Sequence, residues 1–248
     1  MKWDDKPSQP DESRYKSVAE ILHKHATERG AKEFITAMDQ AGRSITYGQL
    51  WRLSNRLSRF LAARNINAGD RIAVLTNNSL EMAVLYFSIQ RYGAAFCTVN
   101  VEVNATHVRE MLNRINPKIV LYHSDCDAEA FGLNERPNIH WVHFGDCDPQ
   151  GTSASDGGLF ETLNNYDEGN DAPHTNPKQD DLCVLSFTSG TSAAPKGVMH
   201  RFGNYYWIAD QTIDMWKLTE SDRMLEFRSL SWASSHMLCL NPALRVGA

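Results

Sequence analysis

Apolar strand patterns alternate with helical patterns through the middle of the chain, and this alternation restricts the fold more than any other feature. Residues 71–76, RIAVLT, form the continuous apolar run that is typical of a strand buried on both faces. A helix is expected at 80–91, a strand at 94–99, a helix at 105–115 and a strand at 118–122. Parallel strands joined by crossover helices have this order, so the sequence predicts an α/β fold of parallel-sheet subdomains with flanking helices.

Further elements are expected on both sides of this unit. Ser17, with Glu20 three residues later, forms a capping pattern that predicts a helix up to Gly30. Leucines and Phe60 at helical spacing predict an amphipathic helix that ends near Arg64. The remaining expected elements are strands at 33–38, 183–187 and 224–227 and helices at 159–163, 204–216 and 234–244.

Residues 188–197, TSGTSAAPKG, have the composition of a phosphate-binding loop. Hydroxyl groups and close-approaching backbone N–H groups can surround an anion, Lys196 adds a positive charge, and Gly197 lets the chain turn back. The spacing is not that of the common P-loop, in which Gly-Lys is followed by Ser or Thr. The alternative is a mobile surface connection, but the fixed offsets of Pro195 and Lys196 favour the phosphate-binding interpretation.

The order of these residues resembles the phosphate loop of the adenylate-forming (AMP-binding) superfamily, TSGTTGxPKG. Ser192 conservatively replaces a threonine, whereas Ala193 stands where the family usually has glycine. If the backbone needs positive φ at Ala193, the alanine costs about 1 kcal/mol. Four further stretches resemble the amino-terminal subdomain of that superfamily and occur in the same order. They are Tyr47 with Leu50, residues 69–75, Asn78-Ser79 with Glu81, and residues 92–100.

This resemblance implies an acid–thiol ligase of the acyl-CoA synthetase type. A small carboxylic acid would attack the α-phosphate of ATP to give an acyl-adenylate, and the thiol of coenzyme A would then displace AMP. The implied cofactors are ATP, magnesium and coenzyme A. Carried over by position, the residues that would hold ATP are Thr188, Ser189, Gly190, Thr191, Ser192, Lys196 and Gly197, with Lys196 catalytic and Thr191 or Ser192 near magnesium.

Trp232 and His236 form a looser match. By spacing from Gly247, Trp232 takes the place of the histidine that this family has at its acyl pocket, and His236 follows one helical turn later. Both residues are therefore candidate catalytic residues that would face the carboxylate or ATP. The alternative is that Trp232 is a core aromatic residue and His236 a satisfied or exposed histidine, and both interpretations stay open.

Composition excludes several classes of function. A formal net charge of −5, with acids and bases mixed along the 248 residues, leaves no basic face for nucleic acid. Residues 1–16 form a polar tail without the apolar core of a signal peptide, and no later run approaches the ~20 apolar residues that span a bilayer. These features indicate a soluble, cytoplasmic protein without a membrane span.

Four residues have the spacing of a possible zinc site: His123, Cys126, His143 and Cys147. A zinc-stabilised interaction domain is therefore a third hypothesis. The cysteines are odd in number and mostly lie in apolar runs, which favours reduced packing residues instead.

The chain is expected to divide into a tail (1–16), a first α/β part of the AMP-binding domain (17–144), an acidic flexible connection (145–181) and a phosphate-loop part (182–248). No later stretch matches the second half of the superfamily, so we expect a truncated, amino-terminal portion that is inactive alone. The missing carboxy-terminal half is a possible partner. The alternatives are a non-catalytic nucleotide-binding remnant and an adenylation domain that serves a carrier protein.

Overall fold

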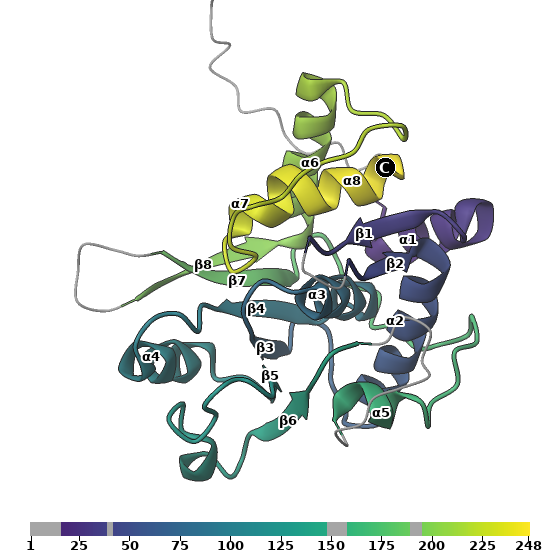
Figure 1. Cartoon of the computed structure of the whole chain (residues 1–248). Coiled ribbons are helices and arrows are strands. Elements are labelled where there is room, and N and C mark those ends of the chain that lie inside the picture. The colour runs from purple at the N-terminus through teal and green to yellow at the C-terminus, as the bar shows by residue number, and fades with distance from the viewer. Residues whose placement is uncertain (1–15, 39–41, 148–157, 189–194) are drawn as a thin grey trace, which may run out of the picture.

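The computed structural model describes residues 16–38, 42–147, 158–188 and 195–248. Its centre is a six-stranded sheet with the order β6-β5-β3-β4-β7-β8 (Figure 1). The first five strands in this order are parallel, and β8 pairs antiparallel with β7. The bounds are β3 Arg71–Leu75, β4 Ala95–Val99, β5 Ile119–His123, β6 His140–Phe144, β7 Leu182–Thr188 and β8 Lys196–Arg201. The predicted α/β fold is confirmed.

Helices cover both faces of the sheet because the strand side chains alternate between two cores. Ile72 and Val74 of β3 point into the larger core, where they meet α2 (Tyr47–Ala62) and α3 (Leu80–Tyr92). Ala73 and Leu75 point into the smaller core, which α4 (Ala105–Ile115) closes. Every residue of α3 is buried, so α3 is an internal helix. The continuous apolar run of β3 is explained by this burial on both faces.

The amino-terminal elements lie on the α2 and α3 side of the sheet. The helix α1, Val18–Arg29, begins at Ser17 with the predicted capping box, in which Glu20 bonds back to the Ser17 backbone. A small antiparallel hairpin follows, β1 Glu33–Thr36 with β2 Ser44–Thr46. Thr46 then caps α2 in the same manner.

The acidic stretch differs from the expected flexible, solvated connection over its described part, residues 158–181. This part contains α5, Leu159–Leu163, and lies along α2. Arginines of α2 bind its carboxylates: Arg56 lies 2.9 Å from Glu168 and Arg59 lies 3.0 Å from Asp167. The apolar side chains of Leu159, Phe160, Leu163 and Ala172 are buried. Composition alone missed this packing, because the arginines that neutralise the acids lie more than a hundred positions earlier.

The last part of the chain forms a helical layer beside β7 and β8. It contains α6 (Phe202–Trp216), α7 (Ala233–Ser235), the π-helical turn η3 (His236–Leu240) and α8 (Asn241–Val246). The expected helix at 234–244 is thus present with a π turn inside it. The strand expected at 224–227 is wrong: this segment has no regular structure, and Leu225 and Phe227 are exposed.

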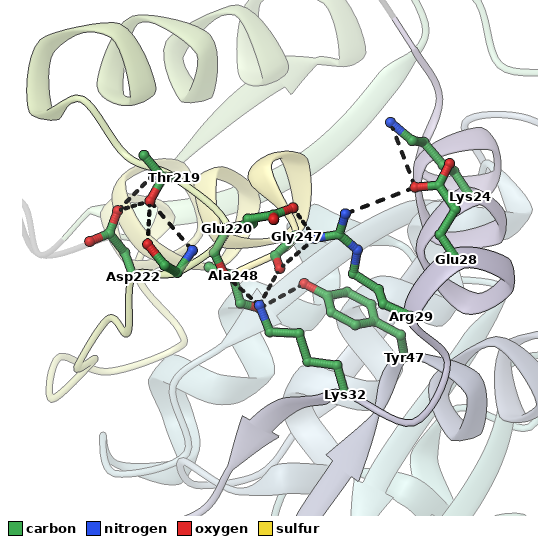
Figure 2. A network of polar contacts seen from close by, with 11 residues as sticks. Lys24, Glu28, Arg29, Lys32, Tyr47, Thr219, Glu220, Asp222, Gly247 and Ala248 are labelled. Carbon is green, nitrogen blue, oxygen red and sulfur yellow. Dashed lines mark hydrogen bonds and ion pairs between the residues drawn. The ribbon is translucent and has the colours of Figure 1, made fainter.

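Figure 2 shows how this layer is joined to the start of the chain. Lys32 Nζ donates to the carbonyl oxygens of Glu220 (2.5 Å) and Gly247 (2.6 Å), and Arg29 binds the Glu220 carboxylate at 2.6 Å. The Tyr47 hydroxyl donates to the carbonyl oxygen of Ala248. Residues more than 180 positions apart are therefore fixed to one another by main-chain carbonyls. Within the described residues, no helix combines the length and the apolar character needed to cross a membrane.

Candidate active site

The carboxyl ends of the parallel strands all lie at one edge of the sheet, and this edge is where a ligand is expected. Strand β4 lies on one side of β3, and the next strand along the chain, β5, lies on the other. Open α/β sheets bind ligands at the carboxyl ends of the strands where the chain order reverses in this way. Leu75, Val99 and Thr188 end β3, β4 and β7 at this edge.

The expected phosphate loop connects β7 to β8 at the same edge. Thr188, the last residue of β7, is directly opposite Lys196, the first residue of β8, and Phe187 is opposite Gly197. The structure therefore brings Thr188, Lys196 and Gly197 together at the loop end of the β7–β8 hairpin. The other expected loop residues, Ser189, Gly190, Thr191 and Ser192, lie outside the described residues.

Lys196 is exposed, and among the residues that the structure describes it has no ion-pair partner. A lysine that is not neutralised by a carboxylate keeps its full charge for an incoming anion. Together with the Thr188 hydroxyl across the hairpin, it gives this end of β7 and β8 a suitable chemistry for phosphate oxygens.

Trp232 lies at the start of α7, and its side chain is 55% exposed. Its backbone is fixed, since its N–H donates to the carbonyl oxygen of Ser229 at 3.0 Å and its own carbonyl accepts from Ser235. The core interpretation of Trp232 is therefore excluded by exposure. An exposed indole on a fixed backbone can stack on a ligand.

His236 is fully buried, and both of its ring nitrogens have partners. Nδ1 lies 2.8 Å from the Tyr205 hydroxyl, and Nε2 lies 2.8 Å from the Leu230 carbonyl oxygen. Burial lowers the pKa of His236 to about 4, so the ring is neutral at pH 7. This environment is that of a satisfied core histidine. The position of His236 thus differs from the expected catalytic one, although the ring supports the backbone just before Trp232.

Two polar residues of this region are not among the predicted site residues. Tyr205, on α6, reaches His236 and lies 5.1 Å from the ring of His200 on β8. Asn78, just after β3, binds the backbone of residues 228 and 230. Asn78 was noticed only as part of a family pattern, and no local signal shows which distant segment an exposed asparagine binds.

An open hollow of about 1440 Å³ is lined by β1, the residues that follow β3 and β5, the start of α3, residues 220–226 and η3, and by no residue of the β7–β8 hairpin. None of the expected site residues lines it. Carboxylates outnumber lysines and arginines in its lining, which repels phosphate groups. The acidic residues are Glu33, Glu81, Asp125, Asp127, Asp146, Glu220, Asp222 and Glu226, against Lys32, Arg43 and Arg223. We therefore place the candidate phosphate site at the hairpin and not in this hollow.

The zinc hypothesis finds no support in the described part of the chain, where no group of three or more potential ligands could hold a metal ion. The Cys126 thiol is directed at the carbonyl oxygen of Leu75, and Cys147 is buried with its N–H bonded to Glu81. His123 lies beside Asp125.

Comparison with known proteins identifies the family. A family model described as AMP-binding enzyme matches residues 22–248. The chain belongs to the AMP-binding enzyme family. The match covers the sheet, the β7–β8 hairpin and the carboxy-terminal helices, so it includes the whole candidate site.

Relatives within the AMP-binding family include two kinds of enzyme. The long-chain-fatty-acid–CoA ligase FadD13 of Mycobacterium tuberculosis is 30% identical over 184 residues, which are 73% of this chain and 34% of that protein. The nonribosomal peptide synthetase sirP of Leptosphaeria maculans is 32% identical over 182 residues, 71% of this chain and 8% of that protein. The chain thus spans about a third of the length of the FadD13 ligase.

A solved structure supports the fold over the entire chain. The anthranilate CoA ligase AuaEII, solved in complex with anthranoyl-AMP, superposes on 100% of this chain and 46% of its own, with a TM-score of 0.77 and 23% identity. The arrangement of sheet and helices described above is therefore the arrangement found in part of an adenylate-forming enzyme.

Proposed function

We propose that this chain supplies the phosphate-binding part of an ATP-dependent acid–thiol ligase. In the reaction, a carboxylate oxygen attacks the α-phosphorus of ATP, pyrophosphate leaves, and an acyl-adenylate forms. A thiol sulfur then attacks the acyl carbon, and AMP leaves with its bonding electron pair. The observation that carries the proposal is the hairpin, in which Thr188 is opposite the exposed Lys196 at the carboxyl edge of the parallel strands.

Each described residue has a defined task in this proposal. The Lys196 ammonium group balances the charge of the β- and γ-phosphates, which becomes the charge of the leaving pyrophosphate. The Thr188 hydroxyl donates to a phosphate oxygen from the opposite strand. Magnesium, held near Thr191 or Ser192, would supply further charge neutralisation for the same oxygens. The exposed ring of Trp232 lies on the carboxylate or nucleotide.

We prefer coenzyme A as the acceptor thiol because the FadD13 and AuaEII relatives are CoA ligases. The sirP relative is a nonribosomal peptide synthetase, which keeps a carrier-protein thiol as the alternative acceptor.

The proposal is tested by binding, because the chain spans only part of its relatives and turnover requires more than the phosphate site. The purified chain is titrated calorimetrically with MgATP, magnesium pyrophosphate and AMP at fixed ionic strength. Lys196→Ala is expected to raise the Kd of ATP and of pyrophosphate by about tenfold or more, since a hydrogen bond to a charged group contributes roughly 1.5–3 kcal/mol. The Kd of AMP should not change.

Lys178→Ala is the matched control, because Lys178 is also exposed and lies in the segment before β7. This variant should bind all three ligands as the unmodified chain does. The proposal is wrong if the unmodified chain does not bind ATP, or if both lysine variants bind ATP and pyrophosphate equally well. Carboxylate-dependent pyrophosphate exchange by the chain alone should be weak or absent.

A further inference from the structure

The side-chain amide of Asn78 binds the backbone of a distant segment with both of its polar groups. Its Nδ2 donates to the carbonyl oxygen of Arg228 at 2.8 Å, and its Oδ1 accepts from the N–H of Leu230 at 2.7 Å. The two partners lie on either side of Ser229. In a parallel sheet, a neighbouring residue bonds the residues that flank its opposite number in the same way. The Asn78 amide thus makes the two hydrogen bonds that one residue of a neighbouring parallel strand would make.

Asn78 itself is held in a fixed position. It lies between β3 and α3, both buried, and the next residue, Ser79, caps α3 by accepting from the N–H of Met82 at 3.1 Å. The amide is short and planar and reaches its partners directly from the carboxyl edge of the sheet. The Asn78 side chain has only two rotatable bonds, so it holds the backbone of residues 228–230 at a defined position and orientation relative to β3.

The other hydrogen bonds of this segment within the described structure are local. Ser235 Oγ donates to the Ser229 carbonyl oxygen at 2.7 Å, and His236 bonds the Leu230 carbonyl oxygen, both across six positions. These bonds fix the shape of the turn into α7. The hydrogen bonds that join residues 228–230 directly to the segment after β3 are those of Asn78, across 150 and 152 positions.

Exposed aromatic side chains lie on both sides of the bound residues. Phe227 is 83% exposed and Trp232 is 55% exposed, whereas Leu230 between them packs into the core. Core packing of Leu230 supplies stability, but an apolar contact has no direction. The Asn78 bonds are directional and hold the backbone that carries the neighbouring aromatic side chains.

We infer that Asn78 is a positioning residue, which holds residues 228–232 at the carboxyl edge of the sheet so that Trp232 faces the bound carboxylate–ATP pair. The ligand in this statement rests on the proposed function, whereas the anchoring role does not. Asn78 touches no reacting atom and acts only through the backbone that it binds.

The experiment uses 5-fluorotryptophan in the full chain and fluorine NMR. Trp232 is one of six tryptophans, so Trp232→Phe identifies its resonance. Asn78→Ala removes both bonds. Asn78→Asp keeps the acceptor for Leu230 but sets a carboxylate oxygen against the Arg228 carbonyl. Asn77→Ala is the matched control, since the described structure shows no side-chain hydrogen bond for this exposed neighbour.

We expect both Asn78 variants to shift or broaden the Trp232 resonance alone, Asn78→Ala more strongly, with no change from Asn77→Ala. Trypsin cleavage after Arg228 should become about thirtyfold faster in Asn78→Ala, the fold-change that corresponds to losing two hydrogen bonds of about 1 kcal/mol each that oppose local opening. In the unmodified chain, MgATP should move the Trp232 resonance. Asn78→Ala should weaken that response without removing the signals of the folded core.

An unchanged Trp232 resonance and cleavage rate in Asn78→Ala would overturn the inference, whatever the chain binds. A chain that binds ATP by calorimetry while its Trp232 resonance stays still would also overturn it. If the Asn78 variants shift Trp232 but ATP does not bind at all, the proposed function fails and the anchoring role of Asn78 stands. If Asn78→Ala does not fold, the Trp232 resonance and the cleavage rate of Asn78→Asp test the inference instead.

Discussion

The Tyr205 hydroxyl lies 2.8 Å from Nδ1 of His236, and the partner of the other ring nitrogen decides which of these two groups donates. The Leu230 carbonyl oxygen, 2.8 Å from Nε2, can only accept a hydrogen bond, so Nε2 carries the proton. Because burial lowers the pKa of His236 to about 4, Nδ1 is unprotonated at pH 7 and the Tyr205 hydroxyl donates to it. A neutral histidine thus connects α6 to the backbone before Trp232.

The first prediction is a loss of stability in mild acid. The pKa of His236 is about 4 in the folded chain against 6.5 when unfolded, so between these values the unfolded chain binds the extra proton. The stabilising contribution is present above pH 6.5 and decreases as the pH falls towards 4. The free energy of unfolding should therefore decrease by roughly 2 kcal/mol from pH 7 to pH 5 because of this histidine. Urea unfolding at the two pH values measures the decrease.

His236→Gln separates this effect from other titrating groups, because glutamine does not titrate. The difference in unfolding free energy between the unmodified chain and the variant should shrink by about 2 kcal/mol from pH 7 to pH 5. A difference that is the same at both pH values would show that the ring is not buried in its neutral form.

Local signals predicted the elements whose stability is local. The Ser17 and Glu20 capping box and the helix at 105–115 occur where the sequence placed them, because caps and helical periodicity act within one or two turns. The spacing predicted that the chain turns back after residues 188–197, and Thr188 and Lys196 are opposite each other in the β7–β8 pair, whereas phosphate binding there stays a prediction.

Contacts with distant residues account for the differences between the predicted and the observed structure. Residues 224–227 are mostly apolar, as in a short strand, but no neighbouring strand pairs with them in the described structure, and Glu226 binds Arg228 instead. The position of His236 depends on Tyr205, thirty-one positions away, and the acidic segment depends on arginines of α2. A pattern within one segment contains no information on such partners, so composition favoured solvent exposure where the structure has contacts.

The second prediction concerns Arg91, a buried arginine that holds residues 172 and 173. Its guanidinium donates to the carbonyl oxygens of Pro173 (2.8 Å) and Ala172 (3.1 Å) and to Ser58 Oγ. Burial lowers its pKa to about 10, so it remains charged at pH 7. Arg91→Met leaves these acceptors without a donor and should reduce the unfolding free energy by about 2 kcal/mol. Proteolysis within residues 158–181 should also become faster.

Arg52→Met is the control for Arg91, since Arg52 is half exposed and its Nε lies 3.8 Å from Glu168. An exposed ion pair contributes about 0.5 kcal/mol or less, so urea unfolding should hardly change. Equal effects of the two substitutions would mean that Arg91 does not hold the segment.

The third prediction compares two glycines with positive φ. Gly93 ends α3 at φ +95°, and a Cβ there would collide with Thr175 and the Pro177 ring. Gly69 has φ +72°, and a Cβ would meet nothing within 4 Å. Gly69→Ala should cost about 1 kcal/mol from backbone strain alone. Gly93→Ala adds the collision and should cost about 3 kcal/mol, measured by urea unfolding. Equal costs would contradict the close contact between α3 and residues 175–177.

The last prediction concerns self-association of the chain. Phe227 and Met199 are 83% and 71% exposed, and β8, which carries Met199, is the last strand in the order of the sheet. Exposed apolar side chains beside a strand edge favour contacts between molecules. The double substitution Phe227→Ser with Met199→Ser should reduce association in sedimentation velocity while the unfolding free energy changes by less than about 0.5 kcal/mol. Leu230→Ser, at a position that is 9% exposed, should instead lower stability by more than about 2 kcal/mol. A chain that stays monomeric at every concentration before substitution would show that these side chains do not drive association.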